Sequence, residues 1–310
     1  MADVLVLTAF LEASVRLGVP LALAALGETL SERAGVINIG LEGSIIAGAL
    51  GGALGALATG SAGLGVVAGA AAGTAVALVF AVFVVVLNTD QIITGTAVTL
   101  GGLGFTAVVY QARFGATGTA LTLPTLEAWR VPLLADLPLV GTALFGQAPT
   151  TYLTYALAPL LWWLLFRTEW GLEIRAAGED PDAAAAAGVR VRTLRAATCL
   201  LAGALAGVAG AHLALAHTGT FSEGMSAGKG FIAIAVVVLG RWNPLLVLAA
   251  ALFFGAASAL QFALQTLGLD VGYQLFLAFP YVLTLLALAG WVGRSRAPAA
   301  LALPWPRDDV

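Results

Sequence analysis

The chain has 310 residues, of which 60% are hydrophobic and only 10% are charged. A soluble domain carries about a quarter charged residues, so this composition excludes a water-exposed globule and indicates a polytopic membrane protein. The net charge of −3, with Lys229 as the one lysine, excludes a basic nucleic-acid surface, and the lone Cys199 excludes a disulfide framework and a thiolate metal site.

Apolar segments without Asp, Glu, Lys or Arg mark the predicted spans, because a helix crosses the bilayer in about 20 residues. The first ends near Leu30, and residues 43–89 hold two spans with a turn at 59–63 between them. Further windows lie at 91–112, 137–166, 196–222, 242–269 and 271–293, with a short apolar piece at 230–240. These runs are continuously apolar rather than alternating, so we predict an all-α bundle of about nine spans (roughly eight to ten) with discontinuous helices, forming one domain over 1–310.

Basic residues are distributed unevenly over the loops that nine spans create. One side holds Arg33, Arg167, Arg175, Arg190, Arg192, Arg195, Arg241, Arg294, Arg296 and Arg307, and the other holds Arg113, Arg130 and Lys229. Because positive residues mark the cytoplasmic side, we predict a cytoplasmic loop at 169–195, a cytoplasmic tail at 293–310, and an external loop at 113–150. Tryptophans near span ends, Trp163 and Trp242 among them, are expected to be interfacial anchors.

Glycines recur at the four-residue spacing that lets two helix backbones approach closely. The GxxxG pairs are Gly48/Gly52, Gly51/Gly55, Gly65/Gly69, Gly69/Gly73 and Gly203/Gly207. They predict a tightly packed bundle and say nothing about a solute.

The first irregular stretch, 31–43, places Asn38, Glu42 and three glycines just before a long apolar run. Glycines and polar groups at membrane depth are typical of discontinuous helices that line a cavity, because the released backbone groups need partners. The alternative is a cytoplasmic turn that ends with a Glu at a helix N-terminus.

A second irregular stretch, 221–231, precedes a helix at 232–240 that is too short to span comfortably. We therefore predict a half-helix behind an extended loop. The two stretches occupy comparable places in the two halves of the chain, as a weak internal duplication would produce.

The third irregular segment, 169–189, contains the capping signals of a short helix. Asp180 is predicted as the N-cap, Pro181 as the first helical residue and Asp182 as a first-turn acid; five alanines follow, and Gly188 closes the helix. A helix that exposes only methyl groups is suited to close docking by another protein. The alternative is a solvated connector.

Four motifs, the last of which has two parts, together resemble the permease subunits of bacterial ABC importers. They are AGVINIGLEG (34–43), AGEDPDAAAAAGV (177–189), AGALAGVAGA (202–211), GKGFIAIA (228–235) and LGRWNP (239–244), and they occur in the family's order over about residues 20–292. The resemblance is to the ribose, nucleoside and branched-chain amino acid type, and most of all to nucleoside or simple-sugar permeases. The 182–188 segment is similar to the Glu-Ala-Ala-type loop that contacts the ATPase, although Asp182 replaces the usual Glu.

The resemblance implies a non-enzymatic subunit of the bacterial cytoplasmic membrane that imports nucleosides or related simple sugars. The chain has no GxxxxGK[ST] stretch, so ATP is expected to bind a partner subunit and the chain is expected to carry no cofactor or metal. The expected partners are a second related permease, an ATP-binding subunit, an external substrate-binding lipoprotein and membrane lipid. Contact with the ATP-binding subunit is expected at Glu179, Asp180, Pro181, Asp182, Ala183, Ala184 and Gly188.

A neutral, hydroxyl-rich solute needs hydrogen-bonding side chains and aromatic faces along its path, with few charges. The residues that fit this description are Asn38, Glu42, Asn88, Gln91, Phe231, Gln261 and Gln265. The alternative is that these amides only join helices to one another.

The residues fit two other functions less well. A proton-coupled secondary transporter needs ionisable groups inside its spans, and Glu42, Asp90 and Arg16 are the candidates, each near a predicted span end. An intramembrane enzyme is disfavoured, because His212 and His217 are five residues apart and point in different directions on a helix.

Overall fold

The computed structural model describes residues 2–115, 121–138, 140–266, 282 and 297–305. The regular structure of these residues is helical, apart from an antiparallel pair of two-residue strands in which Trp129 lies opposite Gln147. The elements are α1 (Ala2–Arg33), α2 (Leu41–Thr59), α3 (Ala62–Ala81), η1 (Val82–Val86), α4 (Gln91–Phe114), β1 (Trp129–Arg130), α5 (Gly141–Phe145), β2 (Gly146–Gln147), α6 (Pro149–Arg167), α7 (Glu169–Glu179), α8 (Pro181–Ala186), α9 (Val191–His212), η2 (Leu213–Thr218), α10 (Lys229–Leu239) and α11 (Pro244–Thr266).

Six helices of the described part are long and apolar enough to cross a membrane. They cover Val6–Arg33, Leu41–Thr59, Ala62–Val86, Gln91–Phe114, Val191–Thr218 and Pro244–Gln261. The all-α, multi-span prediction is thereby confirmed, whereas the count of about nine is not, since the predicted span at 271–293 lies almost entirely outside the described residues. Helix α10 has 11 residues and is about 16 Å long at 1.5 Å per residue, so it cannot cross alone.

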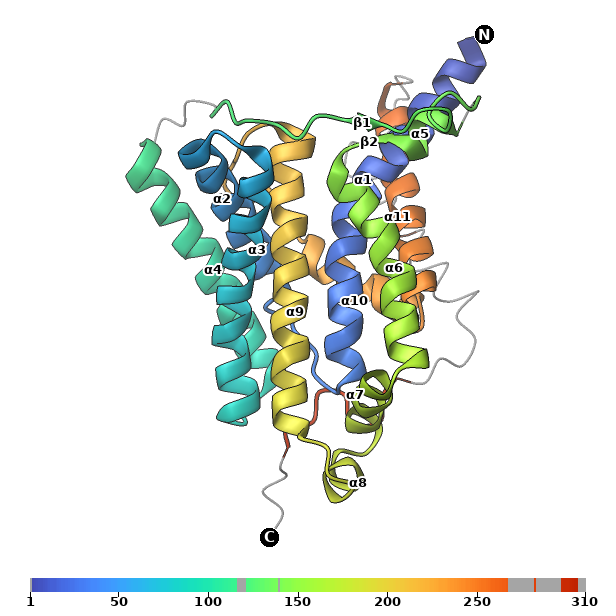
Figure 1. Cartoon of the computed structure of the whole chain (residues 1–310). Coiled ribbons are helices and arrows are strands. Elements are labelled where there is room, and N and C mark those ends of the chain that lie inside the picture. The colour runs from blue at the N-terminus through green and yellow to red at the C-terminus, as the bar shows by residue number, and fades with distance from the viewer. Residues whose placement is uncertain (1, 116–120, 139, 267–281, 283–296, 306–310) are drawn as a thin grey trace.

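The long helices run alongside one another, and the connecting segments collect at the two ends of the bundle (Figure 1). The start of α1 and the β1–β2 pair lie at one end, whereas α7 and α8 lie at the other (Figure 1). Residues 299–300 bond to α7, and the predicted cytoplasmic loop and tail therefore share an end of the bundle. Helix α10 lies within the height of the bundle (Figure 1), and the external side of Lys229, its first residue, stays a prediction.

Glycine stripes set the contact between α2, α3 and α9. A Cβ built on Gly48 would collide with the backbone of Gly207, and one built on Gly73 would collide with the carbonyl oxygen of Gly203. A Cβ on Gly210 would meet the carbonyl oxygen of Ile45. The predicted GxxxG pairs therefore lie on the helix faces that meet. Since lipid gives no hydrophobic driving force between helices, close van der Waals packing at these faces stabilises the contact.

Candidate substrate path and coupling surface

The first irregular stretch is a buried, non-helical link of residues 34–40 between α1 and α2. Gly35 has φ +91°, a backbone conformation that would be strained in a residue with a side chain. Side chains satisfy the released backbone groups: the N–H of Asn38 donates to Oε1 of Glu28 at 2.7 Å, and the N–H of Ile37 donates to Oε1 of Gln91 at 2.9 Å. The predicted break is thus present, and its backbone is satisfied as membrane depth demands.

Asn38 has a different environment from its backbone. Its side chain is fully buried, and neither Oδ1 nor Nδ2 has a hydrogen-bond partner among the described residues. Buried polar atoms are nearly always bonded to protein or water. Asn38 therefore keeps both amide atoms unpaired at the break, among the described residues.

Glu42 joins the first irregular stretch to the second. Its Oε1 accepts from the N–H of Gly228 at 2.8 Å, and its Oε2 accepts from the N–H of Gly230 at 2.6 Å. These donors belong to the first turn of α10, whose N–H groups lack intrahelical partners and favour a negative charge. A Cβ on Gly230 would collide with the backbone of Glu42, which explains the glycine. Glu42 does lie in the first turn of its own helix, α2, as the alternative proposed. Its carboxylate, however, accepts its hydrogen bonds from α10.

Two further carboxylates at the end of α1 were missed as site residues. Glu28 and Glu32 are both fully buried, and each leaves one oxygen without a partner among the described residues. The other oxygen of Glu32 accepts from Nε1 of Trp242, while Nε of Arg33 donates to the carbonyl oxygen of Trp242 at 3.0 Å. Trp242 is only 4% exposed, so its expected role as an interfacial anchor was wrong. Glu32 and Trp242 are 210 positions apart, so no local sequence pattern could have revealed that they pair.

The remaining path candidates are spread over several elements, and one of them, Gln91, contacts the link that carries Asn38. Gln91 is buried and bonds to the 34–40 link, so its amide has a helix-joining role. Asn88 is half-buried with φ 52°, and its Oδ1 has no partner among the described residues. Phe231 is 49% exposed on the outside of this chain, and Gln261 is buried in α11. Gln265 also lies in α11, but its side chain is outside the described residues.

The predicted capping of the short helix is confirmed at both ends of α8. Oδ1 of Asp180 accepts from the N–H groups of Asp182 and Ala183 at 3.1 and 2.9 Å, and Pro181 is the first helical residue. At the other end Gly188 has φ +92° and donates to the carbonyl oxygen of Ala185, while Val189 donates to that of Ala184. These two bonds form a Schellman motif, which ends a helix with a left-handed residue.

The alanine run of α8 has two faces. Ala183, Ala186 and Gly188 are exposed, together with the acids Glu179, Asp180 and Asp182. Ala184, by contrast, is 4% exposed and packs with Pro181 toward the hydrophobic core. A partner protein docking on this conformation of α8 would therefore touch Ala183 and Ala186 and would not touch Ala184.

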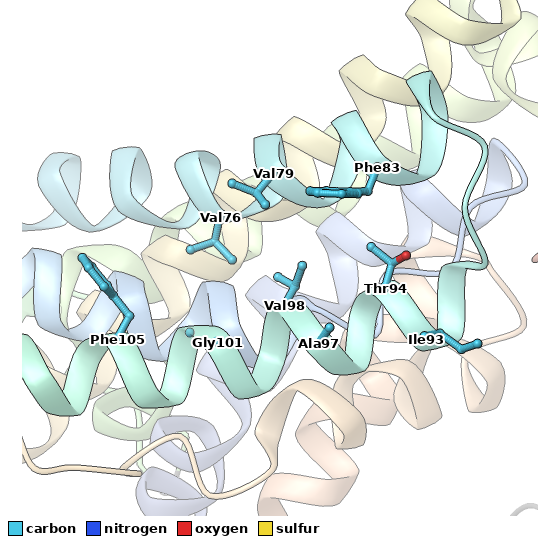
Figure 2. Close-up of a pocket in the computed structure, with 10 residues that line it drawn as sticks. Val76, Val79, Phe83, Ile93, Thr94, Ala97, Val98, Gly101 and Phe105 are labelled. Atoms are coloured by element: carbon cyan, nitrogen blue, oxygen red, sulfur yellow. The ribbon is translucent and has the colours of Figure 1, made fainter.

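A separate apolar cavity of about 480 Å³ lies between the α3–η1 segment and α4. Val76, Val79 and Phe83 face Val98 and Phe105 across it, Ile93 also lines it, and Thr94 supplies a hydroxyl (Figure 2). None of the predicted path residues lines this cavity. Apart from Thr94, its lining side chains among the described residues are apolar, whereas a hydroxyl-rich solute requires several hydrogen-bonding groups.

The chain is similar to known transporter permeases over most of its length. Residues 10–288 match the family described as the permease component of the branched-chain amino acid transport system. The chain is 36% identical to the guanosine ABC transporter permease protein NupQ of Bacillus subtilis, over 97% of each chain. It is 37% identical to the putative glucose ABC transporter permease protein TsgC13 of Haloferax volcanii, over 96% of this chain and 97% of that one.

A third relative is the nucleoside ABC transporter permease protein NupC of Lactococcus lactis, which is 36% identical over 91% of each chain. No solved structure matches the chain. The matched length, the multi-span helical architecture and the full-length relatives show that the chain belongs to this family of ABC transporter permease components.

Proposed function

We propose that the chain is the membrane subunit of an ATP-driven importer for nucleosides or related simple sugars in the bacterial cytoplasmic membrane. The observation that carries the proposal is the near-complete alignment with a guanosine permease and a nucleoside permease, at 36% identity to each. A glucose permease aligns equally well, which keeps simple sugars within the proposed substrate class.

The geometry of the two breaks is consistent with a neutral, polar solute. Asn38 presents unpartnered amide atoms at the first break, and Glu42 uses both oxygens on α10. In this arrangement the carboxylate organises the path, while the amide is available to hydrogen-bond the hydroxyls or the base of a nucleoside. Phe231, on the exposed side of α10, would supply an aromatic face once a second related permease covers that side.

Helix α8 is the proposed contact with an ATP-binding subunit, and the end of the bundle that carries it is proposed to be cytoplasmic. Its exposed methyl groups and capped ends make a small rigid surface. Closure of the ATP-binding subunits would move α8 as a body, and the bundle would respond by alternating access. An external substrate-binding lipoprotein would deliver the solute at the opposite end.

Proton coupling is the second candidate function, because Glu28 and Glu32 are ionisable groups buried within the first span. Each of them accepts a hydrogen bond within the protein: Glu28 from the N–H of Asn38, and Glu32 from Nε1 of Trp242. ABC permease membership favours ATP as the energy source.

The test is transport by the complete complex in proteoliposomes. We expect ATP-dependent uptake of radiolabelled guanosine, with glucose competing weakly or not at all and leucine having no effect. Uptake of leucine without guanosine or glucose would refute the substrate class. Uptake driven by a pH gradient without ATP would favour the proton-coupled alternative.

A further inference from the structure

The tail of the chain returns to the α7–α8 end of the bundle and packs there. Pro298 and Ala300 are buried, and Leu301 and Trp305 pack against the hydrophobic core. Residues 298–305, here named the C-terminal strap, lie beyond the last predicted span, in the segment that the sequence identified only as a cytoplasmic tail.

The strap is bonded to both α7 and α8. The N–H of Ala300 donates to the carbonyl oxygen of Gly178 at 2.9 Å, and that of Ala299 donates to Oε2 of Glu179 at 3.3 Å. Nε1 of Trp305 donates to Oδ1 of Asp182 in the first turn of α8 at 2.7 Å. The Trp305 ring also borders a cavity of about 220 Å³ that is lined by Val189 to Thr193. The strap thus holds the helix that is proposed to contact the ATP-binding subunit.

The same strap is bonded to the link between α1 and α2. The N–H of Ala302 donates to the carbonyl oxygen of Gly35 at 3.2 Å. The carbonyl oxygen of Leu303 accepts from Nε2 of Gln91 at 3.4 Å and from Nη1 of Arg195 at 3.2 Å.

Gln91 and Arg195 use their remaining atoms on the link itself. Oε1 of Gln91 accepts from the N–H of Ile37, and Nε of Arg195 donates to the carbonyl oxygen of Ala34 at 3.0 Å. One continuous set of hydrogen bonds therefore runs from Asp182 on α8, through the strap, to residues 34–37.

We propose that the C-terminal strap mechanically connects α8 to the first break, and that Trp305 is the positioning residue at its α8 end. The proposal rests on the proposed function, in which α8 receives motion from an ATP-binding subunit. A mechanical connection between distant sites needs a physical link, such as a rigid segment or a chain of hydrogen bonds, whose arrangement both sites influence. The strap meets that need, because it touches α8 and the link directly and is short enough to move with both.

The experiment uses the full chain in lipid nanodiscs and follows amide hydrogen exchange at residues 34–37, which requires neither solute nor ATP. Trp305→Phe keeps an aromatic ring and removes the N–H donor, and Asp182→Ala removes the acceptor. Asp182→Asn is the matched control, because its Oδ1 still accepts. We expect several-fold faster exchange at 34–37 in W305F and D182A, no further increase in the double variant, and wild-type exchange in D182N.

The same variants are then assembled with their partner subunits, and guanosine uptake and ATP hydrolysis are measured in the same vesicles. We expect W305F to assemble and hydrolyse ATP normally, while solute moved per ATP falls by about fivefold or more. Unchanged exchange at 34–37 in W305F overturns the proposal whatever solute the complex carries. An equal effect of D182N, or a parallel loss of subunit assembly, also overturns it.

Failure of the proposed function has a different signature. If the wild-type complex transports neither guanosine nor sugar while the exchange pattern follows the expectation, the substrate assignment falls and the strap remains supported.

Discussion

Replacement of Glu42 by Gln tests the connection between the two breaks. The carboxylate accepts two backbone N–H groups, from Gly228 and Gly230, at 2.8 and 2.6 Å. Glutamine has nearly the same shape but one acceptor oxygen, and its amide nitrogen would face the second N–H donor. The substitution therefore removes one hydrogen bond and the negative charge while it conserves volume.

The size of the effect follows from those two losses. A hydrogen bond to a charged group contributes about 1.5–3 kcal/mol, and a charge at a helix N-terminus contributes about 0.3–1 kcal/mol. We expect the attachment of α10 to α2 to weaken by about 2–4 kcal/mol. Since each 1.4 kcal/mol is a factor of ten, the equilibrium between attached and released α10 shifts by about 30-fold or more.

Two measurements check this expectation. Hydrogen exchange at residues 228–231 should accelerate in Glu42→Gln, and ATP-dependent guanosine uptake by the reconstituted complex should fall while membrane insertion stays normal. Glu127→Gln, at an exposed position of the segment 121–138, is the matched control and should behave as wild type. Wild-type exchange and uptake in Glu42→Gln would refute the view that this carboxylate holds the two breaks together.

Three other predictions address orientation, coupling and packing. In a background without Cys199, an impermeant maleimide added to intact cells should label Ala128→Cys and not Ala186→Cys; the opposite result would invert the orientation. Ala186→Trp should abolish uptake and weaken binding of the ATP-binding subunit while insertion stays normal, because Ala186 lies on the exposed face of α8; full transport by this variant would make α8 a simple connector. Gly207→Val should destabilise the bundle by about 1–3 kcal/mol or more through overpacking, since its Cβ would meet the backbone of Gly69. Gly101→Val is the control, because its Cβ meets nothing within 4 Å, and it should leave thermal stability in detergent unchanged. Equal stability of the two variants would refute the packing account.

Features that depend on neighbours in the chain could be predicted from the sequence. The membrane class followed from 60% hydrophobic and 10% charged residues, and the caps of α8 followed from Asp180, Pro181 and Gly188, whose bonds reach only a few positions away. The GxxxG pairs marked the helix faces that meet, because the spacing of one helical turn is a local property. The sequence did not reveal which face of α8 is buried. Nothing in five successive alanines distinguishes buried Ala184 from exposed Ala183.

Features that depend on partners far along the chain were decided by the three-dimensional packing. Glu42 was recognised as a candidate, but its bonds to Gly228 and Gly230 lie 186 and 188 positions away. Gln91, Trp242 and Trp305 likewise acquired their roles from distant partners. The sequence shows which kind of group a carboxylate, an amide or an indole can bond to, but it does not identify the partner residue. In a membrane the buried backbone breaks need such partners, and the packing of the helices determines which side chain lies within reach.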